Sequence, residues 1–267
     1  MYRQKKFRMQ LYRFQNNSKT FWGVASEPDT QDLKYISGSI YEKWNIDEKV
    51  NKDSDFRILP PFDGSHVIGL AYNYKDLVGF SDNYEEPLVF FKSPASVIGG
   101  KDSILIPSRQ KRVDKVWVEV ELALVLKKYL FKATLADLND AILGVTIAND
   151  VTANNVDNRD HHLARSKSLP TFCPIGDYLI QDLDTHSLQM TTIINGVTTQ
   201  KGNTTNRICN DFESLLLLSS LMPLYPGDLI LTGTPKGALS SLIKPGDDVK
   251  LEIEKVGSLN NKIIGEE

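Results

Sequence analysis

The 267-residue sequence has few cysteines, no long apolar run and no large excess of one charge. Its two cysteines, Cys173 and Cys209, cannot form the disulfide framework of a small secreted domain, and neither lies in a metal-binding Cys/His spacing. The most apolar stretch, residues 215–224, is far shorter than the roughly 20 residues that cross a bilayer. The basic amino terminus, MYRQKKFRMQ, is followed by no apolar run of the kind found in signal peptides. We therefore expect a cytoplasmic protein with no membrane partner.

The charges of the chain are nearly balanced. There are 31 Lys and Arg residues against 34 Asp and Glu residues, so the net charge of −3 provides no general attraction to nucleic acid. The amino terminus and residues 109–112 are basic, but charge runs this short are usually solvated turns. We expect a small-molecule substrate and no nucleic-acid partner.

Residues 1–60 differ from the rest of the chain because they are polar and rich in Asn, Lys and Asp. We interpret them as a small N-terminal subdomain, with residues 61–267 as the main domain. From residue 65 onward, short runs with strand propensity alternate with Gly and Pro turns, which predicts a mostly β (α+β) fold. Strands are expected at residues 20–25, 66–70, 87–91, 103–107, 116–126, 142–148, 188–194, 228–232 and 248–254.

Helical periodicity is present in two places, residues 134–141 and 211–222. The second segment follows Asn210, which can accept from the amide of Glu213 while the Glu213 side chain reaches back, as in a capping box. Pro223 is expected to end this helix. The sequence therefore predicts few helices.

Two glutamates lie inside the most apolar predicted strand, residues 116–126. Because side chains alternate along a strand, Glu119 and Glu121 share a face with Trp117, and the opposite face is entirely apolar. Two ionised carboxylates buried there would each cost several kcal/mol unless a positive charge lay between them. We favour a bound cation; the alternative is a solvent-exposed face on which the glutamates are ordinary surface charges.

A third carboxylate, Asp150, follows the predicted strand 142–148, at the kind of strand end where sites are often built. The alternative role is that of a helix cap or turn aspartate. Three carboxylates with no cysteine or nearby histidine suit a hard divalent ion, Mg²⁺ or Mn²⁺. Lys167 would bind an anionic substrate or stabilise an enolate near such an ion, although a loop lysine is usually a solvated charge. The turn at residues 231–237, LTGTPKG, has small residues and hydroxyls that could hold a substrate carboxylate.

Taken together and in this order, the motifs resemble those of the fumarylacetoacetate hydrolase family. The resemblance covers about residues 65–262, and its most specific part is the ordered combination of ExE, ND and TGTP. The matching segments are GLAYNY at 69–74, FFKSP at 90–94, VEVEL at 118–122, GVTIAND at 144–150, KS at 167–168, PIG at 174–176, NG at 195–196, PGD at 226–228 and KPGDD at 244–248.

This resemblance implies a β-roll of mixed sheets and a homodimer. It places the metal ligands on Glu119, Glu121 and Asp150, and it matches Lys167 to the active-site lysine. Thr234 in the TGTP turn and Tyr74 at the edge of the pocket match substrate-binding positions. Members of the family act on small 2-oxo or β-diketo acids by carbon–carbon hydrolysis, decarboxylation or keto–enol isomerisation.

The sequence departs from the family pattern in the segment that follows the NY motif. The family usually has a lid histidine followed by a glutamate, whereas Leu77 occupies the histidine position here and no glutamate follows nearby. The family motif S-A-R-D after Asp150 is replaced by T-A-N-N at residues 152–155. Hydrolysis needs a base that activates water, so we favour tautomerisation or decarboxylation through a metal-stabilised enolate over hydrolysis.

Other residues could replace the missing base. His161 and His162 precede Lys167, and Glu85 and Glu86 lie in the expected lid, residues 79–86, although exposed polar loops are the simpler explanation for all four. A second hypothesis is a catalytically inactive member of the family that binds a metal and a metabolite. The altered lid favours this hypothesis, and the joint presence of the three acids and Lys167 argues against it, because unused buried polar groups are costly.

Overall fold

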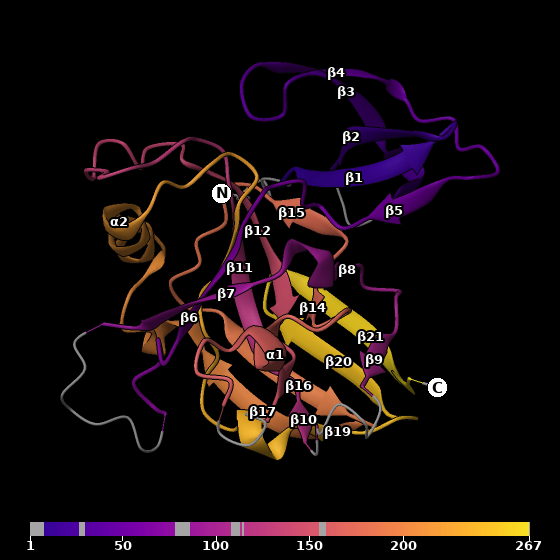
Figure 1. The fold of residues 1–267 in the computed structure, drawn as a ribbon. Coiled ribbons are helices and arrows are strands. Elements are labelled where there is room, and N and C mark those ends of the chain that lie inside the picture. The colour runs from indigo at the N-terminus through magenta and orange to yellow at the C-terminus, as the bar shows by residue number, and fades with distance from the viewer. Residues whose placement is uncertain are drawn as a thin grey trace, which may run out of the picture.

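The computed structural model describes residues 8–26, 30–77, 86–107, 113, 115–154 and 159–266. Within them, one large mixed sheet runs through the molecule and a smaller five-stranded sheet packs against it (Figure 1). The large sheet has the order β4 (Trp44–Lys49), β3 (Lys34–Gly38), β2 (Lys19–Ala25), β1 (Gln10–Asn16), β15 (Tyr178–Ile180), β12 (Ile142–Asn149), β11 (Val120–Leu126), β18 (Leu229–Leu231), β6 (Val67–Ala71) and β7 (Leu88–Lys92), and β5 (Arg57–Leu59) also pairs with β1.

The neighbouring strands of this sheet are antiparallel except for β18 and β6, which are parallel. The five-stranded sheet has the order β17 (Val197–Asn203), β16 (Gln189–Ile194), β20 (Asp248–Ile253), β21 (Gly257–Gly265) and β9 (Ile104–Ile106). Two small sheets complete the described part: β13 (Thr152–Ala153), β10 (Val116–Trp117) and β19 (Leu242–Ile243) form one, and β14 (Cys173–Pro174) and β8 (Val97–Ile98) the other.

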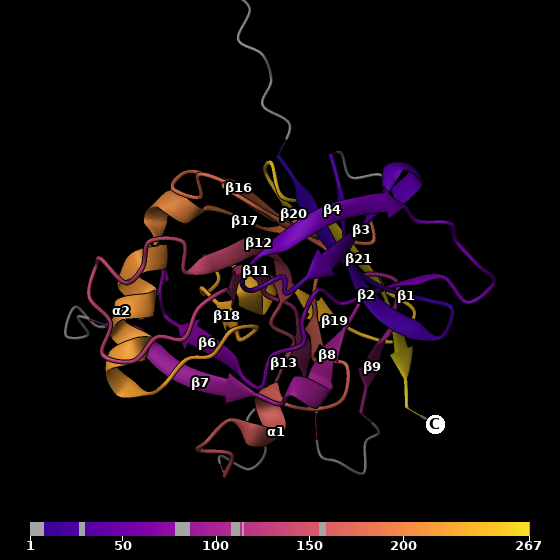
Figure 2. The same cartoon turned by 90° about the horizontal axis from the view of Figure 1, so that it is seen from above.

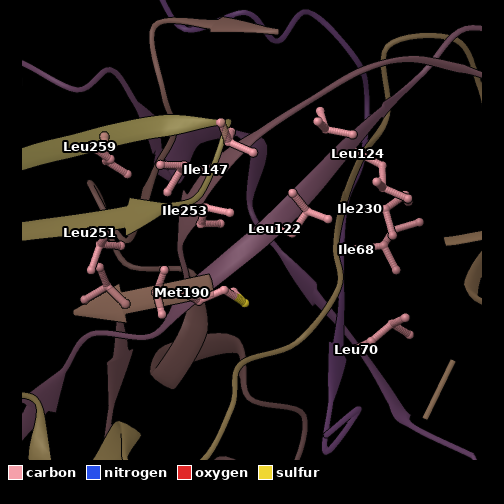
Figure 3. Packing of buried hydrophobic residues seen from close by; sticks show 14 of the residues in the cluster. Ile68, Leu70, Leu122, Leu124, Ile147, Met190, Ile230, Leu251, Ile253 and Leu259 are labelled. Carbon is pink, nitrogen blue, oxygen red and sulfur yellow. The ribbon is translucent and has the colours of Figure 1, made fainter. Parts of the chain in front are cut away.

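The main core lies between the large sheet and the five-stranded sheet. In Figure 3, Leu122 and Ile147 from the large sheet lie near Met190, Ile253 and the neighbouring strands of the smaller sheet. All seven residues of β11 are buried, which agrees with the prediction that both of its faces are covered. The Val120, Leu122 and Leu124 face belongs to the main core, whereas Ala123 and Val125 pack into a second cluster on the opposite side of the sheet.

The predicted strand 116–126 is divided in the structure, because the chain passes from one sheet to another within it. β10 pairs with β13 and β19, and β11 pairs with β12 and β18. The amide of Val118 donates to Ser241, and the carbonyl of Glu119 accepts from the amide of Asp150. This crossing places Glu119 just before β11, while Glu121 lies within it.

The N-terminal strands are continuous with the main sheet, because β1 pairs with β15. They also have an aromatic cluster of their own, in which Phe14 contacts Phe21, Tyr35 and Phe56. The proposed boundary between residues 60 and 61 therefore stays a prediction.

One of the two predicted helices is confirmed. Helix α2 (Asp211–Leu221) begins with the expected capping box and ends before Pro223 (Figure 2). The helix predicted at residues 134–141 is wrong: the segment forms turns, with the amide of Asp137 bonded to Thr134 and that of Ala141 to Leu138. Asp140 has a left-handed backbone with φ of 57°, so a helix cannot continue through it. The other α-helix of the described residues, α1 (Ala164–Lys167), was not predicted.

No helix among the described residues is long and apolar enough to cross a membrane. With two α-helices and mixed sheets in the described part, the expected mostly β fold with few helices is confirmed.

The capping box predicts a measurable loss on substitution. Asn210→Ala removes the acceptor for the amides of Phe212 and Glu213, so we expect the free energy of unfolding to fall by about 1 kcal/mol in urea denaturation. Asn139→Ala is the matched control and should change the free energy of unfolding little, because this side chain is exposed and forms no hydrogen bond with the described residues. Equal losses in the two variants would contradict a capping contribution.

Candidate metal centre and its lysines

Three carboxylates come together where β11 and β12 lie side by side. Glu121 is in β11, Glu119 lies two residues earlier, and Asp150 follows β12. One oxygen from each lies within 4.8 Å of the others. The antiparallel register explains this meeting, because Val120 pairs with Asn149 and the two strand ends therefore coincide. The structure thus brings together all three predicted metal ligands.

The two glutamates are held by donors from different parts of the chain. Glu119 accepts from the indole nitrogen of Trp117 at 2.6 Å and from the hydroxyl of Thr152 at 3.4 Å. Glu121, which is 2% exposed, accepts from the amide of Gly233 at 2.6 Å. These contacts leave other carboxylate lone pairs facing the cluster's interior.

Asp150 lies between two lysine side chains. Its Oδ1 is 2.5 Å from Lys92 Nζ, and both of these side chains are fully buried. Its Oδ2 pairs with Lys167 Nζ, which also donates to Thr152 Oγ1 at 2.7 Å and lies 3.6 Å from Glu119 Oε2. Lys167 therefore belongs to the carboxylate cluster, as predicted, and is not a solvated loop charge.

Lys92 is a member of the site that sequence reasoning missed. The FFKSP motif contains Lys92 without indicating a role for it, yet its ammonium group donates to Asp150 and to the carbonyl of Val151 at 3.1 Å. The sequence did contain an indication of this role. Lys92 is the last residue of an otherwise apolar strand, LVFFK, and a lysine buried there needs a negatively charged or polar partner. Thr152 and Trp117 were also missed as polar supports of the cluster.

The charges of the cluster influence one another. Burial raises the pKa of Glu119 and raises that of Glu121 strongly, and Asp150 adds to both shifts. Burial also acts to raise the pKa of Asp150, but the ammonium groups of Lys167 and Lys92 outweigh it and hold this pKa below its ordinary value. Burial acts to lower the pKa of Lys167, yet Asp150 and Glu119 outweigh it and raise the pKa. Asp150 is therefore the carboxylate whose charge the protein itself neutralises.

Thr234 lies beside the site, but its hydroxyl is already engaged. It donates to the carbonyl of Val120 at 3.0 Å and accepts from Gln200 Nε2 at 2.9 Å. Gln200 also donates to the carbonyl of Pro235 at 2.7 Å. In this arrangement the Thr234 side chain fastens the TGTP turn to β11, and its contact with substrate stays a prediction.

Tyr74 is in the core and not at the edge of a pocket. The residue is fully buried, and its hydroxyl donates to Met190 Sδ at 3.0 Å. The adjacent Asn73 bonds to the carbonyl of Thr232 and to both backbone groups of Cys209. The NY motif thus anchors the segment that precedes residue 78 and does not present the Tyr74 hydroxyl to the cluster.

The candidate replacement bases are exposed or lie outside the described residues. His161, His162 and Glu86 are exposed. Most of the expected lid, including Glu85, lies outside the described residues, as do the basic run 109–112 and Asn155. Leu77 is described, and its side chain packs against the main core.

Comparison with known proteins connects this geometry to a family. A family model for the fumarylacetoacetate (FAA) hydrolase C-terminal domain matches residues 66–264. An uncharacterized protein of Methanocaldococcus jannaschii is 42% identical over 225 residues, which cover 84% of this chain and 92% of that protein. The mitochondrial oxaloacetate tautomerase FAHD2A of Homo sapiens is 34% identical over 195 residues, which cover 67% of this chain and 60% of that protein.

A solved structure gives the same result for the fold. The 5-carboxymethyl-2-hydroxymuconate delta-isomerase of Mycobacterium smegmatis superposes with a TM-score of 0.84 at 31% identity, covering 96% of this chain and 100% of that chain. The match confirms the mostly β fold, and the named relatives are isomerases and tautomerases. The chain is therefore an enzyme of the fumarylacetoacetate hydrolase family.

Proposed function

We propose that this enzyme holds a divalent cation, Mg²⁺ or Mn²⁺, on Glu119, Glu121 and Asp150 and catalyses the keto–enol tautomerisation of a small 2-oxo acid. The observation that carries the proposal is the convergence of three carboxylates within 4.8 Å in a buried site. Oxaloacetate is the substrate named for the FAHD2A relative, and it is the first candidate for this chain.

The residues present fit a dication. Three carboxylates face two ammonium groups, so the cluster has an excess of negative charge, and burial raises the pKa of both glutamates. All the candidate ligand atoms are carboxylate oxygens, which hard divalent ions prefer. When bound, such an ion would polarise adjacent oxygens of a 2-oxo acid and stabilise negative charge on them.

The protein's own groups would divide the remaining work. Lys167, kept charged by Asp150 and Glu119, supplies a hydrogen-bond donor where charge develops on the substrate oxygen. Lys92 holds Asp150 in place from the opposite side. The backbone of the TGTP turn, fixed by Gln200, forms a rigid wall beside Glu121.

The choice of tautomerisation over hydrolysis rests on Leu77. Hydrolysis of a carbon–carbon bond requires a base that deprotonates water. A leucine side chain cannot accept a proton, and this one packs against the core. A proton shift next to a stabilised oxyanion needs no attacking water: the enol oxygen loses its proton to solvent, and the neighbouring carbon takes one from solvent. The FAHD2A tautomerase and the hydroxymuconate isomerase are named for reactions of this kind, which is why we prefer it to the inactive-binder hypothesis.

A substrate panel tests the function. With Mg²⁺ or Mn²⁺ present, we expect enol-oxaloacetate to convert to the keto form faster than in buffer, while acylpyruvates are not cleaved, both followed by ultraviolet absorbance. Glu121→Gln should lower kcat/KM by about 100-fold or more, and Glu48→Gln, at an exposed strand position, should not lower it. Acylpyruvate cleavage with oxaloacetate unaffected would overturn the tautomerase proposal, and inertness toward both substrates despite metal binding would favour the binder.

Metal affinity should increase with pH. Binding requires ionised carboxylates, and the raised pKa of Glu119 and of Glu121 keeps protons on part of the metal-free site under mildly acidic conditions. Lowering the pH therefore strengthens the competition from protons, and metal uptake should release protons. Calorimetry of chelator-treated protein in buffers of different ionisation enthalpy measures both quantities. An affinity independent of pH, with no proton release, would contradict this expectation.

Removing Lys92 should destabilise the metal-free protein. Lys92→Met leaves Asp150 with one cationic partner in a fully buried position, so we expect a loss of about 3 kcal/mol in the free energy of unfolding. The loss should be smaller with Mn²⁺ present, because a dication supplies positive charge beside Asp150. Lys127→Met breaks a pair whose Asp140 side chain is 56% exposed, and this control should cost less than about 1 kcal/mol. Equal losses in the two variants would show that the buried Lys92–Asp150 ion pair contributes no more to the free energy of unfolding than the exposed Lys127–Asp140 pair does.

A further inference from the structure

Lys167 lies on a short segment that is not expected to be stable as a helix by itself. Helix α1 has only four residues, far fewer than the roughly 12 needed for an independent helix. Its N-cap residue, Leu163, has a left-handed backbone with φ of 58° and provides no side-chain cap. His161 and His162 just before it are exposed. Something outside the helix has to fix the direction in which Lys167 points.

The carboxylate of Asp160 supplies that restraint. It is buried, with 7% of the residue exposed, and accepts from the amide and the hydroxyl of Ser166, each at 2.6 Å, and from the amide of Arg165 at 3.2 Å. These are amides at the start of the helix that no helical carbonyl can satisfy. Burial acts to raise the pKa of Asp160, but the hydrogen bonds from Ser166 and Arg165 outweigh it and lower the pKa.

The other end of the segment is attached to the strand that carries Lys92. The Ser168 hydroxyl accepts from the amide of Ser93 at 2.9 Å, and α1 packs beside β7 and β13 (Figure 2). Lys167 is therefore placed between two restraints, Asp160 before it and Ser168 after it. Its ammonium group also lies 4.7 Å from the centre of the Phe90 ring, on β7.

We propose that Asp160 is a positioning residue for Lys167: by holding the Ser166 backbone and hydroxyl, it aims the Lys167 ammonium group at Asp150. The inference rests on the proposed function for the role of Lys167, but it concerns the placement of the side chain and not the reaction. A residue that only stabilised the fold would not act selectively on Lys167.

Chemical labelling of lysines tests this without substrate. Reductive methylation of chelator-treated protein, read by peptide mass spectrometry, should leave Lys167 and Lys92 protected in the wild type, because both are buried in the same charge cluster. In Asp160→Ala we expect Lys167 to be methylated about fivefold faster, the factor that corresponds to the loss of a typical aspartate cap. Lys92, which is held by β7, should stay protected and serves as the internal control.

Further variants test whether the effect on Lys167 is specific to the contact between Asp160 and Ser166. Asp160→Asn keeps an acceptor oxygen and should raise the labelling of Lys167 less than Asp160→Ala does. Asp137→Ala removes an aspartate of the same kind from the turn at Thr134 and should leave Lys167 protected. If Asp160→Ala does not fold, Asp160→Asn and Ser166→Ala provide the test, and each should raise the labelling of Lys167 alone.

Two results would overturn the proposal. One is unchanged protection of Lys167 in Asp160→Ala, Asp160→Asn and Ser166→Ala. The other is an equal increase in the methylation rates of Lys167 and Lys92, which would indicate general loosening of the structure. Where the wild type is active on oxaloacetate, Asp160→Ala should lower kcat, with a smaller further effect in a Lys167→Ala background. A wild type inactive on every 2-oxo acid would refute the proposed function and leave the labelling result standing.

Discussion

The balance of charge among buried carboxylates and lysines constrains how the candidate metal centre is built. Asp150 has no exposed surface, and it is stable there because Lys92 and Lys167 reach it from two directions. Among the described residues, Glu119 has only Lys167, at 3.6 Å, as a cationic partner and shares it with Asp150, and burial raises the pKa of both glutamates. A buried carboxylate with one partner missing is expensive. The elements that carry these five groups are therefore required to meet in one arrangement.

That requirement connects parts of the chain that are distant in sequence. Lys92 ends β7, Asp150 follows β12, and Lys167 lies in α1. The TGTP turn joins them from another direction, because the amide of Gly233 donates to Glu121. Gly233 has φ of +90°, and a Cβ there would lie 2.7 Å from the Leu70 carbonyl oxygen. Only glycine lets the turn approach both β6 and the carboxylate.

The same arrangement separates residues that bind from residues that support. Thr234 and Tyr74 match family positions associated with substrate, yet their hydroxyls bond to Val120 and Met190. Asn73 connects the NY motif to Thr232 and Cys209. The family motifs thus include residues that support the carboxylate cluster as well as the residues of the cluster itself. A motif match identifies a position, and the hydrogen bonds identify what its atoms are free to do.

Much of the fold could be predicted from local pattern. Apolar patterning placed β2, β6, β7, β9, β12, β16, β18 and β20 to within a residue or two, and the Asn210–Glu213 pair identified the start of α2. The strands β1, β3, β4, β5, β15, β17 and β21 of the same two sheets were not predicted. Residues 134–141 show the limit of this reasoning. Their spacing suits a helix, but Asp140 adopts a left-handed backbone with φ of 57°, and the segment forms turns.

The sequence by itself determined which three carboxylates are the candidate metal ligands, because glutamates within an otherwise apolar strand are conspicuous and carboxylate oxygens suit a hard cation. Only the tertiary structure decided that Lys92 faces Asp150 across 58 residues of chain, that Asp160 holds the turn before Lys167, and that the Tyr74 hydroxyl lies in the core. The physical reason is that local periodicity fixes which side of an element a residue occupies. Its contact partner on another element depends on how the separate elements pack and on which buried charges need a neutralising group.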